Sequence, residues 1–360
     1  CVSLLGSLKP LLTDLFTISP FAFSLYPLCD IPIPTPRTMK SKYSVSLNIP
    51  KTVVPSTNPC PCPKPDRPAL VVGKITCDHG KSAEDISTAV RRAHAERRPV
   101  VVNVPLNIEW EEVEYEARPP LNAPASRLAP DPDQLETALG IIASSARPII
   151  LAGRGAVMSN ARDALVRLGE ALGAPLATSL LGTGYFEGEP FNLGIHGTLS
   201  HQIAGETFAM ADCLIVFGAS LNFFTTDYQT LLAGKRVVHV DLNARHIDRH
   251  VTVDAGVVGD ARVVAETMIE MLSEAEHQPS SFRTADLEQR LHDFDLSEAF
   301  DDKSYDGAVD PRTLTRQLDA GLPQDRQVVV DAGRFMLDAL TMSVPSPHDL
   351  VTSHGFGGGG

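Results

Sequence analysis

Glycine and acidic residues follow four apolar runs in the middle of the chain, and these are the positions where we expect ligand chemistry. Gly153-Arg154-Gly155 follows the first run, and Gly218-Ala219-Ser220 follows a later one. Asp241-Leu242-Asn243 and Gly259-Asp260 follow two more. Glycine lets a ligand approach the backbone, and a carboxylate at a strand end can accept a hydrogen bond from a ribose hydroxyl. The pattern suits a nucleotide, although glycine after a strand also serves merely to turn the chain.

Motifs for other chemistries are weak or missing. The region from 130 to 275 has no G-x-G-x-x-G of the dehydrogenase type, and the sequence has no G-x-S-x-G of the hydrolase type. One residue separates Cys60 from Cys62, whereas zinc knuckles and thioredoxin-like motifs need two. His246 and His250 have the spacing of metal ligands on one helical face, but the charged residues around them indicate a solvated surface. We therefore assign no catalytic and no metal-ligating residue.

The apolar runs alternate with amphipathic patterns, and this alternation defines the elements that must position the candidate residues. Apolar strands are expected at Pro148 to Ala152, Pro175 to Thr178, Cys213 to Phe217 and Arg236 to Asp241. Helices are expected at Asp133 to Ala146, Ala161 to Leu172, Ser200 to Met210 and Ala261 to Leu272. Buried strands separated by amphipathic helices indicate a parallel sheet covered on both faces. We therefore predict a doubly wound α/β domain with six strands over residues 130 to 275.

The parts that flank this region differ from it. Residues 1–68 hold 13 of the 28 prolines, which excludes a long helix or a central strand there. A capped helix that begins at Ser82 and a β-branched strand from Val100 to Pro105 resemble half of a βαβ unit. We divide the chain into an irregular segment rich in proline and cysteine at 1–81, an α/β remnant at 82–116, a central α/β domain at 117–278, a linker at 279–310, and the start of another α/β domain at 311–360.

Charge and composition exclude several function classes. The chain of 360 residues carries 44 acidic against 31 basic residues, so its net charge of −13 disfavours nucleic acid as a partner. Every stretch of 18 residues that is otherwise apolar is broken by proline or charge, which disfavours a membrane span. The cysteines indicate a reduced compartment, the cytoplasm or an organelle. Because the sequence starts with Cys1 rather than Met, we expect it to be a fragment of something longer.

A series of short motifs carries a resemblance to a known family. The motifs are Gly173-Ala174-Pro175-Leu176-Ala177-Thr178, Gly182-Thr183-Gly184, Pro190, Gly194-Ile195-His196-Gly197-Thr198, the run from Ala211 to Ala219, Val238-His239-Val240-Asp241 and Gly259-Asp260. Their order and spacing resemble the central domain of thiamine-diphosphate-dependent enzymes, with acetolactate synthase and its decarboxylase relatives as the most similar branch. The resemblance implies a nucleotide-binding fold of the DHS-like type, between a pyrimidine-binding domain and a pyrophosphate-binding domain.

By this resemblance, residues 82–116 look like the end of the pyrimidine-binding domain, and residues 311–360 look like the opening of the pyrophosphate-binding domain. The family activates its cofactor through a glutamate early in the pyrimidine-binding domain, where this sequence is rich in proline. The family also holds Mg²⁺ and the diphosphate on a Gly-Asp-Gly motif, and these 360 residues contain none. We therefore expect weak or no binding of thiamine diphosphate, and no catalysis, by this chain alone.

The resemblance also implies candidate cofactor residues. In acetolactate synthases the central domain carries FAD, and the matching positions here are Gly153, Arg154, Gly155, Thr178, Leu180, Ile195, His196, Gly218, Ala219, Asp241 and Asp260. The family's Gly-Ala-Arg-Phe-Asp-Asp-Arg is replaced by the sequence from Gly218 to Phe224, which lacks both arginines. Gly333, Gly355 and Gly357 match positions where the backbone of the family approaches thiamine diphosphate, but Gly359 stands where the family has Met or Ile.

Two hypotheses of different classes follow. The first is a fragment of a 2-keto acid carboligase or decarboxylase, a transferase or lyase that resembles acetolactate synthase and whose intact form is a homodimer or tetramer. The second is a noncatalytic module that binds FAD or ADP, with a fold related to sirtuins and electron-transfer flavoproteins. Colour and turnover of pyruvate distinguish the two hypotheses, since a yellow and inactive protein favours the second.

Overall fold

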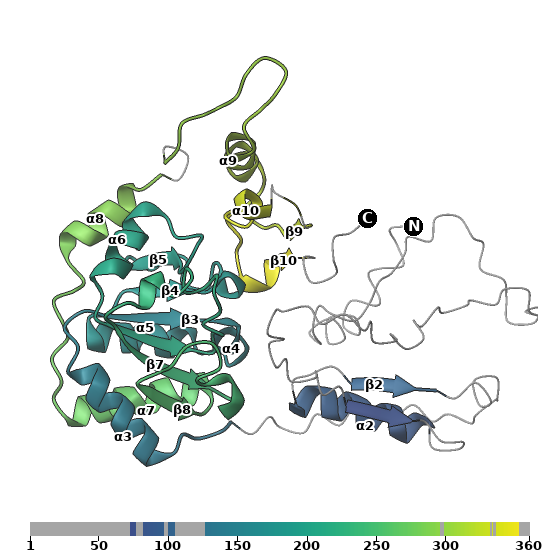
Figure 1. Ribbon diagram of the computed structural model, residues 1–360, viewed down its shortest axis with the longest axis vertical. Helices are drawn as coiled ribbons and strands as arrows, with labels where there is room; N and C mark the ends of the chain where they lie inside the picture. Colours follow the sequence, from purple (N-terminus) through teal and green to yellow (C-terminus); the bar gives the residue numbers. More distant parts are fainter. Residues whose placement is uncertain are drawn as a thin grey trace, which may run out of the picture. The chain divides into compact units, whose positions relative to one another are not determined.

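The computed structural model of the protein describes residues 73–76, 82–96, 100–104, 127–295, 299–331, 333 and 336–352. The chain divides into two compact units, Cys1–Ala123 and Pro124–Gly360, each of which is described by itself. Figure 1 shows the described elements coloured along the sequence. No helix of the described residues is both long enough and apolar enough to cross a membrane.

The first unit contains a parallel pair of strands with a helix between them in sequence. Strand β1 (Gly73–Thr76) pairs with β2 (Val100–Asn103), and α2 (Ser82–Glu96) connects them. The expected helix from Ser82 and the strand from Val100 are thus present, and the predicted half of a βαβ unit has its second strand in β1. The sequence of β1, Gly-Lys-Ile-Thr, is too short and too polar to be recognised as a strand.

A six-stranded parallel sheet forms the centre of the second unit. Its spatial order is β5-β4-β3-β6-β7-β8, and every neighbouring pair is parallel. The strands are β3 (Pro148–Ala152), β4 (Leu176–Thr178), β5 (Asn192–Ile195), β6 (Cys213–Phe217), β7 (Arg236–Asp241) and β8 (Ala255–Val258). β4 and β5 follow one another outward on one side of β3, and β6, β7 and β8 follow one another on the other side, which is the 3-2-1-4-5-6 order of dinucleotide-binding folds. The predicted doubly wound α/β fold is confirmed.

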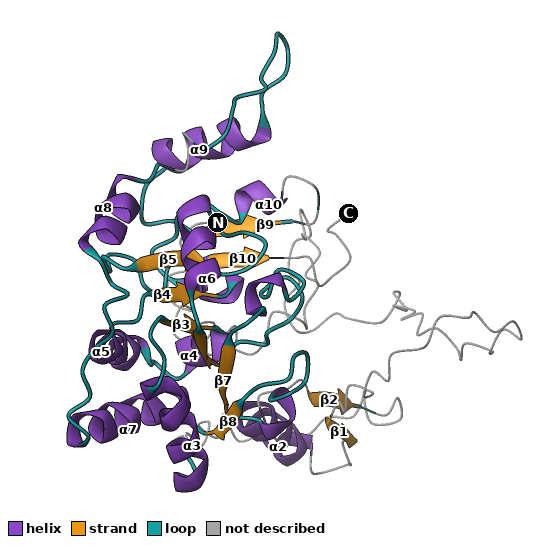
Figure 2. Cartoon of the chain, turned by 60° about the vertical axis from the view of Figure 1, so that its left-hand side comes forward, coloured by secondary structure: helices purple, strands orange, loops and turns teal. Residues whose placement is uncertain are grey.

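Helices cover both faces of this sheet because the strands present apolar side chains on each face. Ile150 and Ala152 of β3 pack on one face, whereas Ile149 and Leu151 pack on the other. The first face is covered by α3 (Pro132–Ala143), α4 (Arg154–Met158), α5 (Arg162–Leu172) and α7 (Ala261–Glu274). The second face is covered by α6 (Gln202–Met210) and α8 (Ala285–Asp293). Figure 2 shows these helices around the sheet.

Local signals in the sequence fix where the helices begin and end. Asp131 accepts hydrogen bonds from the first amides of α3, and Pro132 occupies the first turn, where no donor is needed. Helix α5 ends at Gly173, which adopts φ +63°. A Cβ at Gly173 would also lie 2.9 Å from the backbone nitrogen of Ser280, so both the turn and the packing require glycine.

Three elements of the second unit differ from the sequence-based expectation. Strand β5 is new, because Asn192 and Gly194 give it little apolar character and only Leu193 is buried. Helix α4 is also new, since it occupies the residues expected to be a loop after β3. Helix α8 lies within 279–310, where composition predicts a linker, yet its Leu287 is buried. The domain boundaries themselves stay predictions.

The end of the described chain forms a smaller substructure. Helix α9 (Pro311–Gly321) leads to β9 (Val328–Val330), which pairs in parallel with β10 (Leu350–Thr352) after the short α10 (Met336–Ala339). Val328, Val330 and Leu340 form an apolar cluster against which Leu180 and Leu199 of the central region pack. Four short 3₁₀ helices complete the list of elements: η1 (Leu180–Gly182), η2 (Thr230–Leu232), η3 (Ala244–His246) and η4 (Pro347–Asp349).

Candidate functional site

The carboxyl ends of β3 and β6 are the first place to look for a ligand site. These two strands are neighbours in the sheet although 60 residues separate Ala152 from Cys213 in sequence, and the direction of strand order reverses between them. In open α/β sheets, ligands bind outside the carboxyl ends of the strands at such a switch point. Gly153 and Gly218, which follow β3 and β6, both lie there.

The loops after β3 and β6 touch each other through their backbones, and we call Gly153, Gly155, Gly218 and Ala219 the glycine contact. The Gly153 amide donates to the Phe217 carbonyl at 2.8 Å, and the Gly155 amide donates to the Gly218 carbonyl at 3.0 Å. A Cβ on Gly155 would lie 2.7 Å from Gly218 Cα, and one on Gly153 would lie 2.6 Å from Ala219 Cβ. These glycines are therefore required for the two loops to pack.

The other candidates at the first three strands differ in their surroundings. Arg154 is exposed at the start of α4. Thr178 is buried at the end of β4, and its hydroxyl donates to the Gly194 carbonyl at 3.4 Å. Leu180 packs against the apolar cluster of the C-terminal substructure, and Ile195 ends β5 half-buried. Of these residues, Arg154 alone carries a charge.

His196 is a buried residue that anchors the loop after β6. Its Nδ1–H donates to the Thr225 carbonyl at 2.7 Å, and its ring lies 4.3 Å from that of Phe208. Burial lowers the pKa of His196 to about 4, so the ring is neutral near pH 7. The Thr198 amide donates to the Phe224 carbonyl at 3.0 Å and adds a second link to the same loop. His196 thus holds a loop in place, and its donor nitrogen is already used.

Asp241 at the end of β7 is also engaged within the chain. Its Oδ1 accepts from the Asn243 amide at 2.8 Å and from His246 Nδ1 at 3.0 Å. His246 belongs to η3, which ends at His246, so His246 and His250 do not share the helical face that their spacing would allow. Over the described ranges, no group of three or more His, Cys, Asp or Glu residues is arranged to hold a metal ion.

Asp260 has a structural role at the start of α7. Its buried carboxylate accepts from the amides of Arg262 at 3.1 Å and Val263 at 3.3 Å, which makes it the N-cap of the helix. The same Oδ1 lies 3.3 Å from Arg127 Nη1, and that guanidinium also donates to the Ser159 carbonyl at 3.0 Å. Arg127 therefore links the chain segment that precedes α3 to Ser159 at the end of α4 and to Asp260 at the start of α7.

Replacing Asp260 by alanine should lower the free energy of unfolding by about 1–2 kcal/mol, because both amide partners lose their acceptor. Asp260→Asn is the matched control, since asparagine caps a helix about as well as aspartate but cannot pair with Arg127 as a charge. We expect the asparagine variant to lose well under half as much. Urea denaturation followed by circular dichroism measures both values, and equal losses would contradict the capping role.

The three candidates near the end of the chain are less informative. Gly333 lies exposed after β9. Gly355 and Gly357 lie outside the described residues. The assignment of these three glycines to a cofactor rests on the resemblance alone.

Sequence reasoning missed two features of the carboxyl edge. His239 of β7 is buried, burial lowers its pKa, and its Nε2 has no hydrogen-bond partner among the described residues. Phe223, Phe224 and Tyr228 form an exposed aromatic group in the loop after β6, with ring centroids 4.0 and 5.5 Å apart. The pair Phe223-Phe224 after a predicted strand is the signal that would have drawn attention to this loop.

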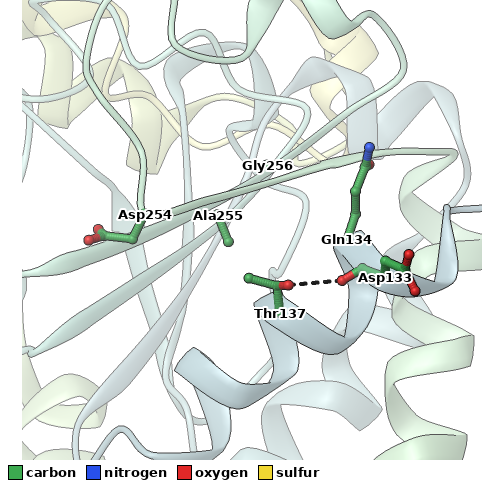
Figure 3. Close-up of a pocket in the computed structure, with 6 residues that line it drawn as sticks. All are labelled: Asp133, Gln134, Thr137, Asp254, Ala255 and Gly256. Carbon is green, nitrogen blue, oxygen red and sulfur yellow. Dashed lines mark hydrogen bonds between the residues drawn. The ribbon is translucent and has the colours of Figure 1, made fainter.

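Two open depressions lie away from the switch point. One has a volume of about 360 Å³ between the start of α3 and the start of β8 (Figure 3). Near it, the Gln134 side chain accepts the Val258 amide of β8 at 3.0 Å. The other has a volume of about 430 Å³ beside Phe300 and Arg312. Neither is lined by a candidate cofactor residue.

Comparison with known proteins identifies the central region. Residues 135–268 match the family described as thiamine pyrophosphate enzyme, central domain. A probable acetolactate synthase large subunit from Methanococcus aeolicus is 31% identical over 181 residues, which are 48% of this chain and 30% of the relative. The acetolactate synthase isozyme 3 large subunit from Escherichia coli K12 is 29% identical over 231 residues, 62% of this chain and 40% of the relative.

Another relative is named for a different activity. A sulfoacetaldehyde acetyltransferase from Rhodobacter capsulatus is 28% identical over 279 residues, 71% of this chain and 47% of the relative. The chain thus spans less than half the length of each of these three relatives.

Proposed function

We propose that the chain, whose residues 135–268 match the central domain of thiamine pyrophosphate enzymes and which is similar to acetolactate synthase large subunits, is part of a 2-keto acid carboligase or decarboxylase. The observation that supports the proposal is the family match over residues 135–268, which coincides with the six-stranded sheet in 3-2-1-4-5-6 order. The sheet and its helices then serve as the central domain of such an enzyme. A transferase or lyase activity would belong to the enzyme as a whole.

The residues present do not make a complete site for thiamine diphosphate. When bound, this cofactor supplies an electron sink for the cleavage and formation of bonds beside a carbonyl group. A diphosphate needs a divalent cation with oxygen ligands, and the 360 residues contain no Gly-Asp-Gly motif to hold Mg²⁺. Gly333, Gly355 and Gly357 stay proposed points of approach to the cofactor. We derive no catalytic step from this chain.

We expect the 360-residue chain, supplied with thiamine diphosphate and Mg²⁺, to leave pyruvate unconsumed. The physical reason is the missing metal motif together with the absence of a residue assigned to activate the cofactor. The measurement is pyruvate consumption against time, with the Escherichia coli relative as the positive control in the same buffer. Circular dichroism under the assay conditions is the control for folding of the chain.

Turnover by this chain alone would overturn the proposal of inactivity. The proposal of the enzyme class has a separate test, which is the coding sequence on either side of the present one. An upstream glutamate in the pyrimidine-binding domain and a downstream Gly-Asp-Gly would support a keto acid enzyme. Flanking sequence without either motif would contradict that class.

The remaining parts of the proposal concern assembly and surroundings. The intact protein is proposed to be a homodimer or tetramer, because the family forms its cofactor sites between subunits.

The proposed compartment is a reducing one, the cytoplasm or an organelle. Cys213 is a free, buried thiol, and burial raises its pKa to about 11. The alternative of a noncatalytic FAD- or ADP-binding module is not favoured by the comparisons, which match thiamine pyrophosphate enzymes and acetolactate synthases.

A further inference from the structure

We propose that the carboxyl edge of the central sheet binds neither FAD nor ADP and is instead closed by contacts within the chain. This inference goes beyond the proposed keto acid chemistry and stands whether or not that chemistry is found. The strand order leads one to expect a dinucleotide at the switch point between β3 and β6. The groups that would bind its diphosphate and its ribose are wholly or partly engaged within the chain, and a second cation to balance the charge of the diphosphate is missing from the two loops.

The position for a diphosphate is occupied by the glycine contact. In dinucleotide-binding folds, the glycines after the first strand leave space and free amides for the phosphates. Here the Gly155 amide donates to the Gly218 carbonyl, and the Gly153 amide donates to the Phe217 carbonyl. Because Gly155 and Gly218 are too close to accept even a Cβ between them, their missing side chains are used for backbone packing and not for a ligand.

The neighbouring helix offers no other source of amides for phosphate. Helix α4 has five residues, Arg154–Met158. The amides of Ala156 and Val157 both donate to the Gly153 carbonyl, at 3.0 Å and 3.2 Å respectively. At α7, the buried carboxylate of Asp260 already occupies the first amides, and its negative charge disfavours a phosphate there. At α4 the amides of Gly155, Ala156 and Val157 are therefore used within the protein, and at α7 the amides of Arg262 and Val263 are used in the same way.

The side chains for a ribose and a base are partly engaged as well. Asp241 would accept a ribose hydroxyl, and the Asn243 amide and His246 already donate to one of its two carboxylate oxygens, Oδ1. His196 uses Nδ1 to hold Thr225, and burial keeps its ring neutral. The free acceptor of buried His239, its Nε2, is a lone pair when the ring is neutral and does not attract phosphate oxygens.

The charge at the switch point is also insufficient for a diphosphate. Arg154 is the cation of the loop after β3, and the loop after β6 contributes no Lys or Arg from Gly218 to Gln229. The position of a second cation is taken by neutral residues such as Ser220 and by the aromatic rings of Phe223 and Phe224. Charge-assisted hydrogen bonds are the strong contacts of phosphate sites, and one exposed arginine does not supply a pair of them.

The test is equilibrium dialysis of the purified 360-residue chain against FAD and, separately, against ADP. We expect no absorbance near 450 nm after purification and dissociation constants weaker than about 1 mM for both ligands. The Escherichia coli relative, treated in the same way, serves as the comparison protein. Unfolding curves with and without 1 mM ligand give a second readout, and we expect the two curves to coincide because nothing binds the folded state.

Three results would overturn the proposal. The first is stoichiometric flavin after purification, and the second is ADP bound at a ratio near one per chain. The third comes from the double variant Ser220→Arg with Phe224→Arg, which adds cations without changing the glycine contact. We expect this folded variant to bind no more FAD than the parent chain. FAD binding gained in the double variant would show that the edge is open and lacks only charge.

Discussion

Replacing Gly218 by alanine should lower the free energy of unfolding by about 3 kcal/mol. Gly218 adopts φ +62°, and a Cβ there would lie 2.5 Å from Gly155 Cα and 2.8 Å from the Ala156 nitrogen. The substitution therefore combines backbone strain with a clash against another backbone, which cannot move aside as a flexible side chain can. Urea denaturation monitored by circular dichroism, at constant slope against urea, measures the loss.

Gly140→Ala is the matched control for this experiment. Gly140 lies within α3, and a Cβ there meets nothing within 4 Å. Alanine is favoured over glycine inside a helix by about 0.5–1 kcal/mol, so this variant should be slightly more stable than the parent. If Gly218→Ala unfolds at the same urea concentration as the parent chain, the glycine contact is not closely packed and the closed carboxyl edge is wrong.

Lowering the pH from 6.5 to 4 should remove about 3 kcal/mol of stability through His196 alone. The unfolded chain protonates histidine near pH 6.5, whereas burial lowers the pKa of His196 in the folded chain to about 4. The unfolded state therefore binds the proton first as the pH falls, so stability is complete above pH 6.5 and decreases down to pH 4. Burial also lowers the pKa of His201 and of His239, which adds to the loss in the same direction.

The variant His196→Gln isolates the contribution of this residue. Its free energy of unfolding should depend less steeply on pH between 6.5 and 4 than that of the parent chain, although its stability at pH 7 is lower. His348→Gln is the control, because His348 is exposed and its replacement should leave the slope unchanged. An unaltered slope in His196→Gln would mean that its ring is not buried in the neutral form.

The sequence predicted the buried strands of the central sheet well because each is apolar on both faces. Cys213–Phe217 and Arg236–Asp241 have the bounds expected from the residues alone. Strand β5 was missed because Leu193 is its one buried residue. Helix α8 was missed because charged residues surround Leu287, which the second face of the sheet buries. Burial by a distant element cannot be read from a short window of sequence.

The candidate site was predicted in position and not in detail. The residues after β3, β6 and β7 do lie at the carboxyl edge, as parallel topology requires. Their partners were not foreseen, since Arg127 and Asp260 are 133 residues apart in sequence and His196 and Thr225 are 29 apart. Periodicity gives no information about such pairs, and each of them changes a candidate ligand residue into a structural one.

The contact between Gln134 and β8 has a consequence for how the sheet ends. β8 is the last strand on its side, and an outer strand with unbonded amides is a template on which a strand of another molecule can assemble. The Gln134 side chain in α3 takes up the Val258 amide. By acting as a substitute for a seventh strand at that point, it discourages growth of the sheet into an aggregate.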